Sequence, residues 1–226
     1  MPLRTPHKRA LVAGGTGRVG TAIAERLRAE GWSVFAAGSA DGDLRTRAGA
    51  AALAVRALDE LGGLDLVVHA AGDGFVPKPV DDITEEDWDA AMGVTAKGTL
   101  FLAQAAAPAL RDARGVLVIV EDVASFQAWP SFAAHCAAKA AQAMLTRVLA
   151  RALAPEVRVC GVAPGAVAVE PGQEARRAAE TLLGRVGDPD DVAEAVLFLS
   201  AAGYVTGATL VVDGGRMLKS SGGGSP

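Results

Sequence analysis

Cysteine is scarce in this 226-residue chain, and long apolar runs are missing. Two cysteines, Cys136 and Cys160, are too few for a disulfide framework, and they fall in a predicted helix and a predicted strand. We therefore expect reduced core residues in a cytoplasmic protein. No uninterrupted apolar run approaches the roughly 18 residues that a membrane helix needs, which predicts a soluble protein.

A strong excess of charge is missing as well. The formal net charge is -4, so electrostatics gives no reason to expect nucleic acid or an anionic membrane as a partner. The basic start, Arg4 to Arg9, leads straight into a strand and has no apolar segment with a cleavage site, unlike a secretory signal. No cluster of His, Cys and carboxylate side chains predicts a metal site.

The chain does contain a regular alternation of short apolar runs and longer helical patterns. Near-continuous apolar strands separated by helices are typical of a parallel sheet covered on both faces, the doubly wound α/β class of the Rossmann fold. The predicted strands are Ala10–Ala13, Trp32–Ala37, Leu64–Val68, Val116–Val120, Val157–Val162 and Thr209–Val212. The predicted helices are Ala22–Glu30, Ala48–Leu61, Glu85–Leu110, Phe132–Leu153 and Asp190–Leu199.

The alternation is interrupted after the second predicted strand. Only a short polar stretch, Gly38 to Leu44, separates this strand from the next helix, whereas a full crossover takes a dozen or more residues. The edge strand of the usual order 3-2-1-4-5-6, and its helix, are therefore predicted to be shortened or missing. Residues 1–218 form one predicted domain, and the Gly/Ser-rich tail 219–226 is predicted to be disordered.

A glycine-rich turn, Ala13-Gly-Gly-Thr-Gly-Arg-Val-Gly20, joins the first predicted strand to the first helix. Glycines allow a tight turn, and the helix N-terminus offers free N–H groups to a pyrophosphate, so the turn predicts a dinucleotide site. Arg18 would face the ribose end and clamp a 2′-phosphate. The second strand ends at Ala37-Gly38-Ser39 with no acid until Asp41, where NAD-selective sites usually carry one. Both features favour NADPH.

Three chemically active side chains lie around the fourth predicted strand and the helix that follows it. Asp122 closes the apolar run Val116–Val120, and His135 and Lys139 are four residues apart in an alanine-rich helical stretch. This spacing puts both side chains on one helix face, within reach of a single substrate. The three residues are the candidate catalytic group. The alternative is a solvated helix face with an incidental His and Lys.

Four segments together resemble the short-chain dehydrogenase/reductase family across nearly the whole chain. They are the turn Ala13–Gly20, the pattern Asp122…His135-x-x-x-Lys139, the stretch Ala154–Gly165, and the pair Gly184–Val192 with Tyr204–Gly215. The resemblance implies that the cofactor is held by Gly14, Thr16, Gly17, Arg18, Val19, Gly20, Ser39, Asp43, Leu44, Ala71, Gly72, Lys139, Pro164 and Gly165.

Two departures from the usual family pattern are similar to the pteridine reductase and dihydromonapterin reductase branch. Arg18 stands where most members carry glycine, and Asp122 stands where most carry serine. The ending Val211-Val-Asp-Gly-Gly-Arg-Met-Leu218 is similar to the same branch. The resemblance therefore makes a dihydropterin the leading candidate for the substrate.

The reaction that the family resemblance implies is hydride transfer to a carbonyl or imine carbon, assisted by a tyrosine acid and a lysine. Here Lys139 is kept, but His135 occupies the tyrosine position, and Ala70 and Thr95 occupy those of two asparagines. A protonated His135 supported by Asp122 predicts a slow or specialised NADPH-dependent reductase. The alternative is a dinucleotide-binding protein that has lost catalysis and serves as a binding or regulatory module.

Further candidates surround this group. Phe126 and Trp129 follow Asp122 and either stack on a flat heterocycle or cover the core. His69 ends a buried strand, and we expect a hydrogen-bonded structural role for it. By analogy with the family, the faces of helices Glu85–Leu110 and Phe132–Leu153 imply a homodimer or homotetramer.

Overall fold

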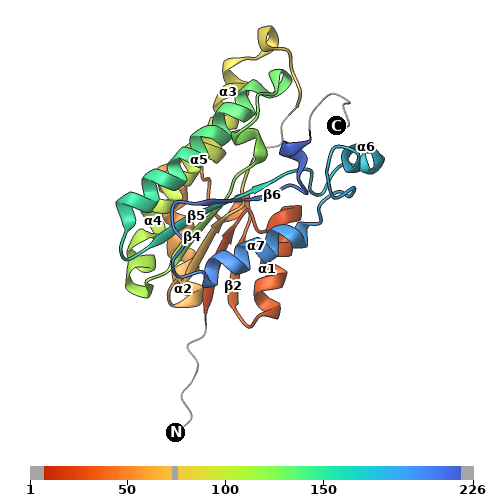
Figure 1. The fold of residues 1–226 in the computed structure, drawn as a ribbon. Helices are drawn as coiled ribbons and strands as arrows, with labels where there is room; N and C mark the ends of the chain where they lie inside the picture. The colour runs from red at the N-terminus through yellow and green to blue at the C-terminus, as the bar shows by residue number, and fades with distance from the viewer. Residues whose placement is uncertain (1–7, 73–75, 220–226) are drawn as a thin grey trace.

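The computed structural model describes residues 8–72 and 76–219 and contains a six-stranded sheet between two layers of helices (Figure 1). All neighbouring strands pair in parallel, in the order β2-β1-β3-β4-β5-β6. The strands are β1 (Arg9–Ala13), β2 (Ser33–Ala37), β3 (Leu66–His69), β4 (Val116–Val120), β5 (Arg158–Pro164) and β6 (Thr209–Val212). The predicted doubly wound class is confirmed. Of the predicted tail, 219–226, the structure describes Lys219, and residues 220–226 lie outside the described residues.

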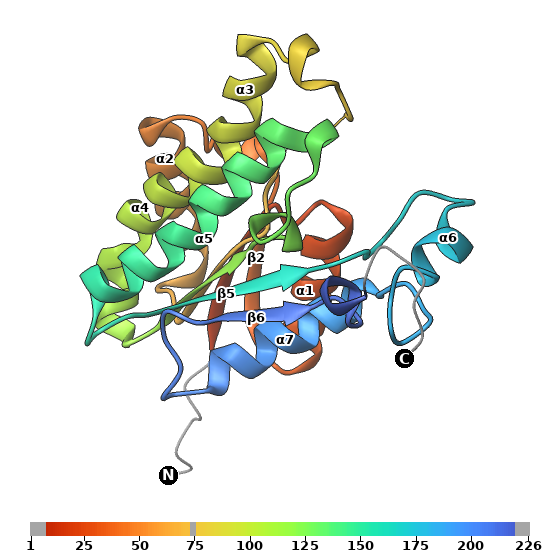
Figure 2. The ribbon, with the colours of Figure 1, turned by 45° about the horizontal axis from the view of Figure 1, so that its top comes forward.

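The helices divide between the two faces of the sheet, as Figures 1 and 2 show. One face carries α1 (Arg18–Ala29) and α7 (Pro189–Ala201), and the other carries α2 (Arg47–Leu61), α4 (Gly98–Ala113) and α5 (Ala133–Leu153). The two shorter helices are α3 (Glu85–Met92) and α6 (Glu174–Ala178). Each face has its own hydrophobic cluster, so the sheet is buried on both sides.

The edge of the sheet beside β2 is open, as the short polar stretch predicted. The chain passes from β2 through one 3₁₀ turn, η1 (Ser39–Asp41), directly into α2. Thr46 caps α2 by accepting a hydrogen bond from the Gly49 backbone N–H at 3.0 Å. Because the lost strand would have been the outermost one, the pairing of β1 with β2 and β3 is intact.

The long helix predicted over Glu85–Leu110 is interrupted in the structure. A π-helical turn, η3 (Gly93–Lys97), separates α3 from α4, and such turns insert an extra residue into the helical repeat. The periodicity of the sequence does not reveal it, because apolar residues continue on both sides. This turn brings the Thr95 carbonyl to the inner side of the helix layer, where it accepts hydrogen bonds from two side chains.

The two cysteines are free thiols in different surroundings. Cys160 is buried in β5, as predicted, whereas Cys136 on α5 is only partly buried. The prediction of a core position for Cys136 is therefore wrong, because its side chain lies beside the face that α5 packs inward. Within residues 8–72 and 76–219, no helix is both long and apolar enough to span a bilayer.

Candidate functional site

A cleft of about 430 Å³ opens at the carboxyl ends of β1, β2 and β3, the edge at which open α/β sheets bind ligands. Its walls come from the glycine turn, the segment after β2 and the segment after β3. The predicted cofactor residues in its lining are Gly14, Thr16, Gly17, Ser39, Asp43, Leu44, Ala71 and Gly72. These predicted cofactor residues thus lie together, on all three walls of one cleft.

The glycine turn is packed so closely that side chains are excluded from it. Gly14 has φ +83°, and a Cβ there would lie 2.5 Å from the Ala71 backbone nitrogen. A Cβ on Gly20 would collide with the Gly14 carbonyl. Gly17 begins α1 without a side-chain cap, so the amides of Arg18, Val19 and Gly20 in the first helical turn are available to an anion. This cradle fits a dinucleotide pyrophosphate.

At the carboxyl end of β2 the cleft has a charged rim, and the sequence predictions did not include its arginine. Arg45 lines the cleft and pairs with Asp43, with Nε 2.9 Å from Oδ1 and Nη2 3.1 Å from Oδ2. These hydrogen bonds lower the pKa of the Asp43 carboxyl. The lining is completed by Ala13, Gly38, Gly42, Leu53, Ala70 and Val94. Arg45 directly follows the predicted pair Asp43-Leu44, which was the available signal.

Arg18 is engaged with a different part of the chain. Its Nη2 lies 2.8 Å from Oε1 of Glu170, in the segment after β5, and both side chains are largely exposed. The nearest acid to the end of β2 is also engaged: Asp41 accepts a hydrogen bond from the Gly38 N–H at 2.8 Å and pairs with Arg56. The two acids that the structure describes at this end, Asp41 and Asp43, therefore each have a protein partner already.

Asp122 and His135 come together as the sequence predicted. Asp122 follows β4, where its Oδ1 accepts a hydrogen bond from the Ala124 N–H at 2.7 Å. Its Oδ2 lies 3.5 Å from Nε2 of His135 in the first turn of α5. The His135 side chain is 10% exposed and that of Asp122 is 22% exposed, so the pair sits at the boundary between core and solvent. A second cavity, of about 130 Å³, borders His135 on its α3 side.

Lys139 lies one turn further along α5, and its ammonium is turned into the protein. Nζ donates to the Val120 carbonyl at 3.0 Å, the Glu121 carbonyl at 3.3 Å and Oε1 of Gln142 at 2.9 Å. An ammonium has three N–H donors, so protein acceptors use all of them. Burial lowers the pKa of Lys139 below its ordinary value, while the charges of Asp122 and Glu121 partly offset this effect.

A buried polar group extends from Lys139 along the inner face of α5, and the sequence predictions missed it. Oε1 of Glu121 accepts hydrogen bonds from Thr146 at 2.6 Å and Thr209 at 3.3 Å. Gly161 leaves room for this carboxylate, since a Cβ there would collide with it. Burial raises the pKa of Glu121, which its two hydrogen bonds oppose. The signal was the spacing of Lys139, Gln142 and Thr146, which places three polar residues on one helix face.

His69 is fully buried at the end of β3. Burial, followed by repulsion from Lys139, lowers its pKa to about 4. Neither ring nitrogen makes a well-aligned hydrogen bond within the part of the chain that the structure describes, although the Val94 backbone lies close enough to favour the charged form slightly. The predicted hydrogen-bonded role is therefore wrong, because His69 is enclosed by packing against Gly98.

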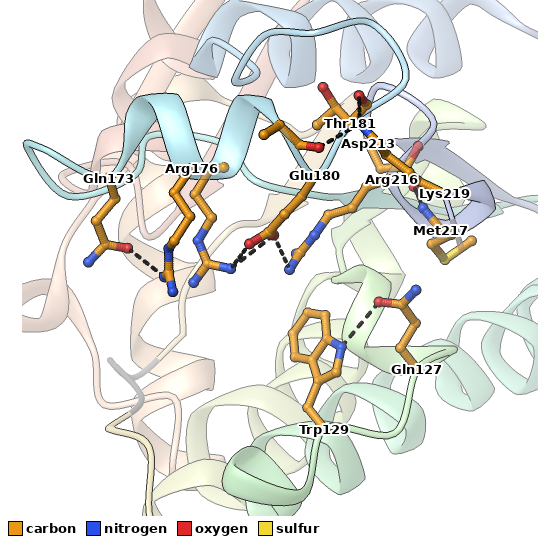
Figure 3. A network of polar contacts seen from close by, with 12 residues as sticks. Gln127, Trp129, Gln173, Arg176, Glu180, Thr181, Asp213, Arg216, Met217 and Lys219 are labelled. Atoms are coloured by element: carbon orange, nitrogen blue, oxygen red, sulfur yellow. Dashed lines mark hydrogen bonds and ion pairs between the residues drawn. The ribbon is translucent and has the colours of Figure 1, made fainter. Parts of the chain in front are cut away.

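The far side of the site is built from the segments after β4, β5 and β6. Pro164 ends β5, and the Gly165 N–H donates to the Val212 carbonyl at 3.0 Å. Figure 3 shows how these segments meet: Arg216 lies 5.0 Å over the Trp129 ring and pairs with Glu180 at 2.8 Å. One face of Trp129 is thus already covered. Phe126 is exposed, so it does not cover the core.

No group of three or more His, Cys, Asp or Glu side chains in residues 8–72 and 76–219 has the arrangement that a metal ion needs.

Comparison with known proteins agrees with this geometry. The family model described as Enoyl-(Acyl carrier protein) reductase matches residues 38–216. The inactive 2-(S)-hydroxypropyl-CoM dehydrogenase 2 of Xanthobacter autotrophicus is 38% identical over 86% of this chain and 90% of its own. The 3beta-hydroxysteroid dehydrogenase 1 of Eggerthella lenta is 36% identical over 93% and 94%.

One solved structure with the same fold contains a bound dinucleotide. Gluconate 5-dehydrogenase from Burkholderia cenocepacia, in complex with NADP and tartrate, superposes with a TM-score of 0.85 at 26% identity, covering 94% of this chain and 96% of its own. The family model spans the walls of the cleft after β2 and β3, the Asp122–His135 pair and the segments after β5 and β6. The chain therefore belongs to the short-chain dehydrogenase/reductase family of NAD(P)-dependent oxidoreductases.

Proposed function

We propose that this chain is an NADPH-dependent reductase that acts on a carbonyl or imine carbon of a small substrate, with a dihydropterin as the leading candidate. The dinucleotide, when bound, supplies the hydride. His135 supplies the proton, and Asp122 orients His135. The observation that carries this proposal is the approach of Asp122 Oδ2 to His135 Nε2, 3.5 Å apart at the mouth of a nearly buried site.

The distance between these two atoms is compatible with a proton donor in an enzyme that has no substrate bound. It is longer than a good hydrogen bond, and catalytic hydrogen bonds are often loose before the substrate binds. Because Nε2 is buried beside Asp122, the imidazole must turn about its side-chain bonds to present this N–H to a substrate oxygen or ring nitrogen. The cavity of about 130 Å³ beside His135 offers space for a small substrate group.

The choice of NADPH over NADH rests on the residues at the carboxyl end of β2, where the cleft would hold the ribose of the cofactor. A 2′-phosphate is repelled by an acid there, and Asp41 is held by Gly38 and Arg56. Arg45 and Arg18 are the cations nearest to this end and to the turn. Each must exchange its carboxylate partner for the phosphate, and a dianionic phosphate is a stronger partner for a guanidinium. The pterin assignment rests on the resemblance at Arg18 and Asp122.

A second candidate function is supported by Lys139. Its three N–H groups are committed to protein acceptors, so it has none to offer a ribose hydroxyl without breaking one of these bonds. In this alternative the chain binds the dinucleotide and does not turn over. One relative is itself described as inactive.

Turnover distinguishes the two functions. NADPH consumption by the purified protein is measured against dihydropterins, simple carbonyls and a ketosteroid, with fluorescence of bound NADPH followed in parallel. We expect oxidation of NADPH with a dihydropterin. Turnover only with a simple carbonyl or the ketosteroid would assign that class as the substrate in place of a dihydropterin. Tight NADPH binding without any turnover would establish the second function, dinucleotide binding without catalysis.

The role of the pair is tested by Asp122→Asn and Asp122→Ala. General-acid assistance is worth roughly 10²–10⁴-fold, so we expect kcat to fall by about 10²-fold in Asp122→Ala while the Kd for NADPH stays within about twofold. The exposed Asp59→Asn on α2 is the matched control. Unchanged turnover in Asp122→Ala would remove the pair from the mechanism.

We also propose a homodimer or homotetramer formed through α3 and α5. Large apolar side chains on these helices are exposed: Trp88 at 45%, Met144 at 53% and Val148 at 52%. Alanine-rich helix faces allow close packing between copies. Sedimentation velocity of the wild type and of Met144→Glu tests this, because a charge at the centre of the interface should favour the monomer.

A further inference from the structure

Gln142 is the most completely bonded side chain of the buried polar group on α5. It is 0% exposed. Its Oε1 accepts from Lys139 Nζ at 2.9 Å, while its Nε2 donates to the Thr99 hydroxyl at 3.0 Å and the Thr95 carbonyl at 3.3 Å. Thr99 in turn donates to the Thr95 carbonyl at 2.6 Å. The amide therefore connects Lys139 to the π-helical turn.

The orientation of this amide is fixed by the chemistry of its neighbours. An ammonium only donates and a carbonyl only accepts, so Oε1 must face Lys139 and Nε2 must face Thr95. A flipped amide would place two donors against each other and two acceptors against each other. Because all partners are buried, such a mismatch is costly. The side-chain amide of Gln142 thus has one stable orientation, and this orientation fixes the position of the Lys139 ammonium.

We propose that Gln142 is a positioning residue of the proposed active site, because its amide determines where the Lys139 ammonium lies. The inference rests on the proposed function, in which the Lys139 charge acts on the Asp122–His135 pair one helical turn away. Gln142 touches neither that pair nor the cleft lining. Its hydrogen bonds lead to the site through Lys139 and through Thr95, which lines the cavity beside His135, and the titration of Lys139 follows the first of these routes.

Several charged groups face Lys139 from the elements packed around it. Asp122 and Glu121 approach from the end of β4, and His69 approaches from the end of β3. His135 precedes it by one turn on α5. These groups are unchanged when only residue 142 is substituted, so a change in the titration of Lys139 reports on the Gln142 contact.

The test follows the titration of the Lys139 amine directly. The protein is labelled with ¹³C at the lysine Cε, and the chain offers few signals to resolve: Lys8, Lys78, Lys97, Lys139 and Lys219. Lys139→Arg assigns the signal. A hydrogen bond to a charged group is worth about 1.5–3 kcal/mol, and each pKa unit corresponds to about 1.4 kcal/mol. In Gln142→Met we expect the midpoint to fall by about one unit or more.

Two further variants separate positioning from a general loss of packing. Gln142→Glu keeps an acceptor and adds a negative charge, so the midpoint should move to higher pH than in the wild type. Thr99→Val removes one support of the amide and should move the midpoint in the same direction as Gln142→Met, by less. The exposed Gln104→Met on α4 is the matched control and should leave the midpoint unchanged.

The outcomes distinguish this inference from the proposed function. Opposite shifts in Gln142→Met and Gln142→Glu, with a several-fold loss of turnover in the former, support a positioning role. Equal midpoints in all variants, or shifts in one direction for both, would overturn it even if the protein reduces its substrate normally. Opposite shifts in a protein without turnover would leave the Gln142 contact established and end the proposed function.

Discussion

The two helix layers that cover the sheet differ in what they bury. The buried residues of α1 and α7 are all apolar or glycine. On α5, four of the ten buried residues are polar. Within residues 8–72 and 76–219, the buried polar side chains gather on the α4–α5 face, with Thr181 as the exception: His69, Thr95, Thr99, Glu121, His135, Lys139, Gln142 and Thr146.

The difference concerns the buried helix faces, because the N-terminus of α1 itself lies at the cleft. The buried face of α1 and α7 serves the packing of the fold, whereas the buried face of α4 and α5 also holds polar groups of the site. Burying polar groups costs free energy unless each finds a partner, and apolar groups of the same size would serve the core equally well. The α1–α7 face buries apolar residues and glycine, in agreement with this expectation. The α4–α5 face does not, although it packs on the same strands. Its polar residues are therefore best explained by the site at its edge.

The largest effect on stability is expected on the apolar face. Ile23 on α1 is fully buried in its hydrophobic cluster. Ile23→Ala should lower the free energy of unfolding by about 2–5 kcal/mol, from lost burial and the cavity left behind. Urea unfolding measures this, and the affinity for NADPH, measured by fluorescence in parallel, should not change.

The control for this substitution is Val55→Ala on the exposed side of α2, where we expect a change below about 0.5 kcal/mol. A large loss of NADPH affinity in Ile23→Ala would mean that the two layers are not separable, since Ile23 lies outside the cleft lining.

The same division describes what the sequence could predict. The strands follow from continuous apolar runs, and their predicted and observed bounds differ by no more than two residues. The glycine turn predicted one wall of the cleft, and the short stretch Gly38–Leu44 predicted the open edge beside β2. These features depend on local pattern and on chain length, both of which can be read directly.

The features that the sequence did not predict depend on contacts between distant segments. The π-helical turn at Gly93–Lys97 has no periodic signature. The link from Lys139 to Gln142 and Thr99 joins two helices, and Arg18 meets Glu170 across more than 150 residues. The Asp122–His135 pair was a hypothesis from the family resemblance, and the two residues meet because the parallel sheet brings the end of β4 beside the start of α5. Where such a rule was missing, as for Gln142, the residue was passed over.

A smaller effect on the free energy of unfolding, specific to the α4–α5 face, is expected at acidic pH. The pKa of His69 is about 4 in the folded protein and about 6.5 when unfolded. Because the folded state resists protonation, the contribution of His69 to stability is complete above pH 6.5 and is lost as the pH falls toward 4. The full loss is about 3 kcal/mol.

Urea unfolding of the wild type and His69→Leu between pH 7 and pH 4 measures this loss. Leucine has a similar volume and does not titrate, so the variant should lose less stability over the same range. Carboxylates elsewhere contribute equally to both proteins and cancel in the difference. Parallel curves would show that His69 is not the titrating group.

The smallest effect should come from Glu121, and it has the opposite dependence on pH. Burial raises the pKa of Glu121, and its hydrogen bonds from Thr146 and Thr209 partly offset this. Its folded form therefore resists losing a proton. Stability is complete below the unfolded pKa of about 4.3 and falls as the pH rises through the folded pKa.

Glu121→Gln imitates the protonated carboxyl and keeps the acceptor for Thr146, so it should not show this fall. The variant should equal the wild type at pH 4 and exceed its free energy of unfolding at pH 8, with the exposed Glu60→Gln on α2 as the control. If the variant were less stable at pH 8, the charged carboxylate would be stabilising the fold through Lys139. The polar group would then belong to the architecture of the core as well as to its chemistry, and the contrast between the two helix layers would be one of degree.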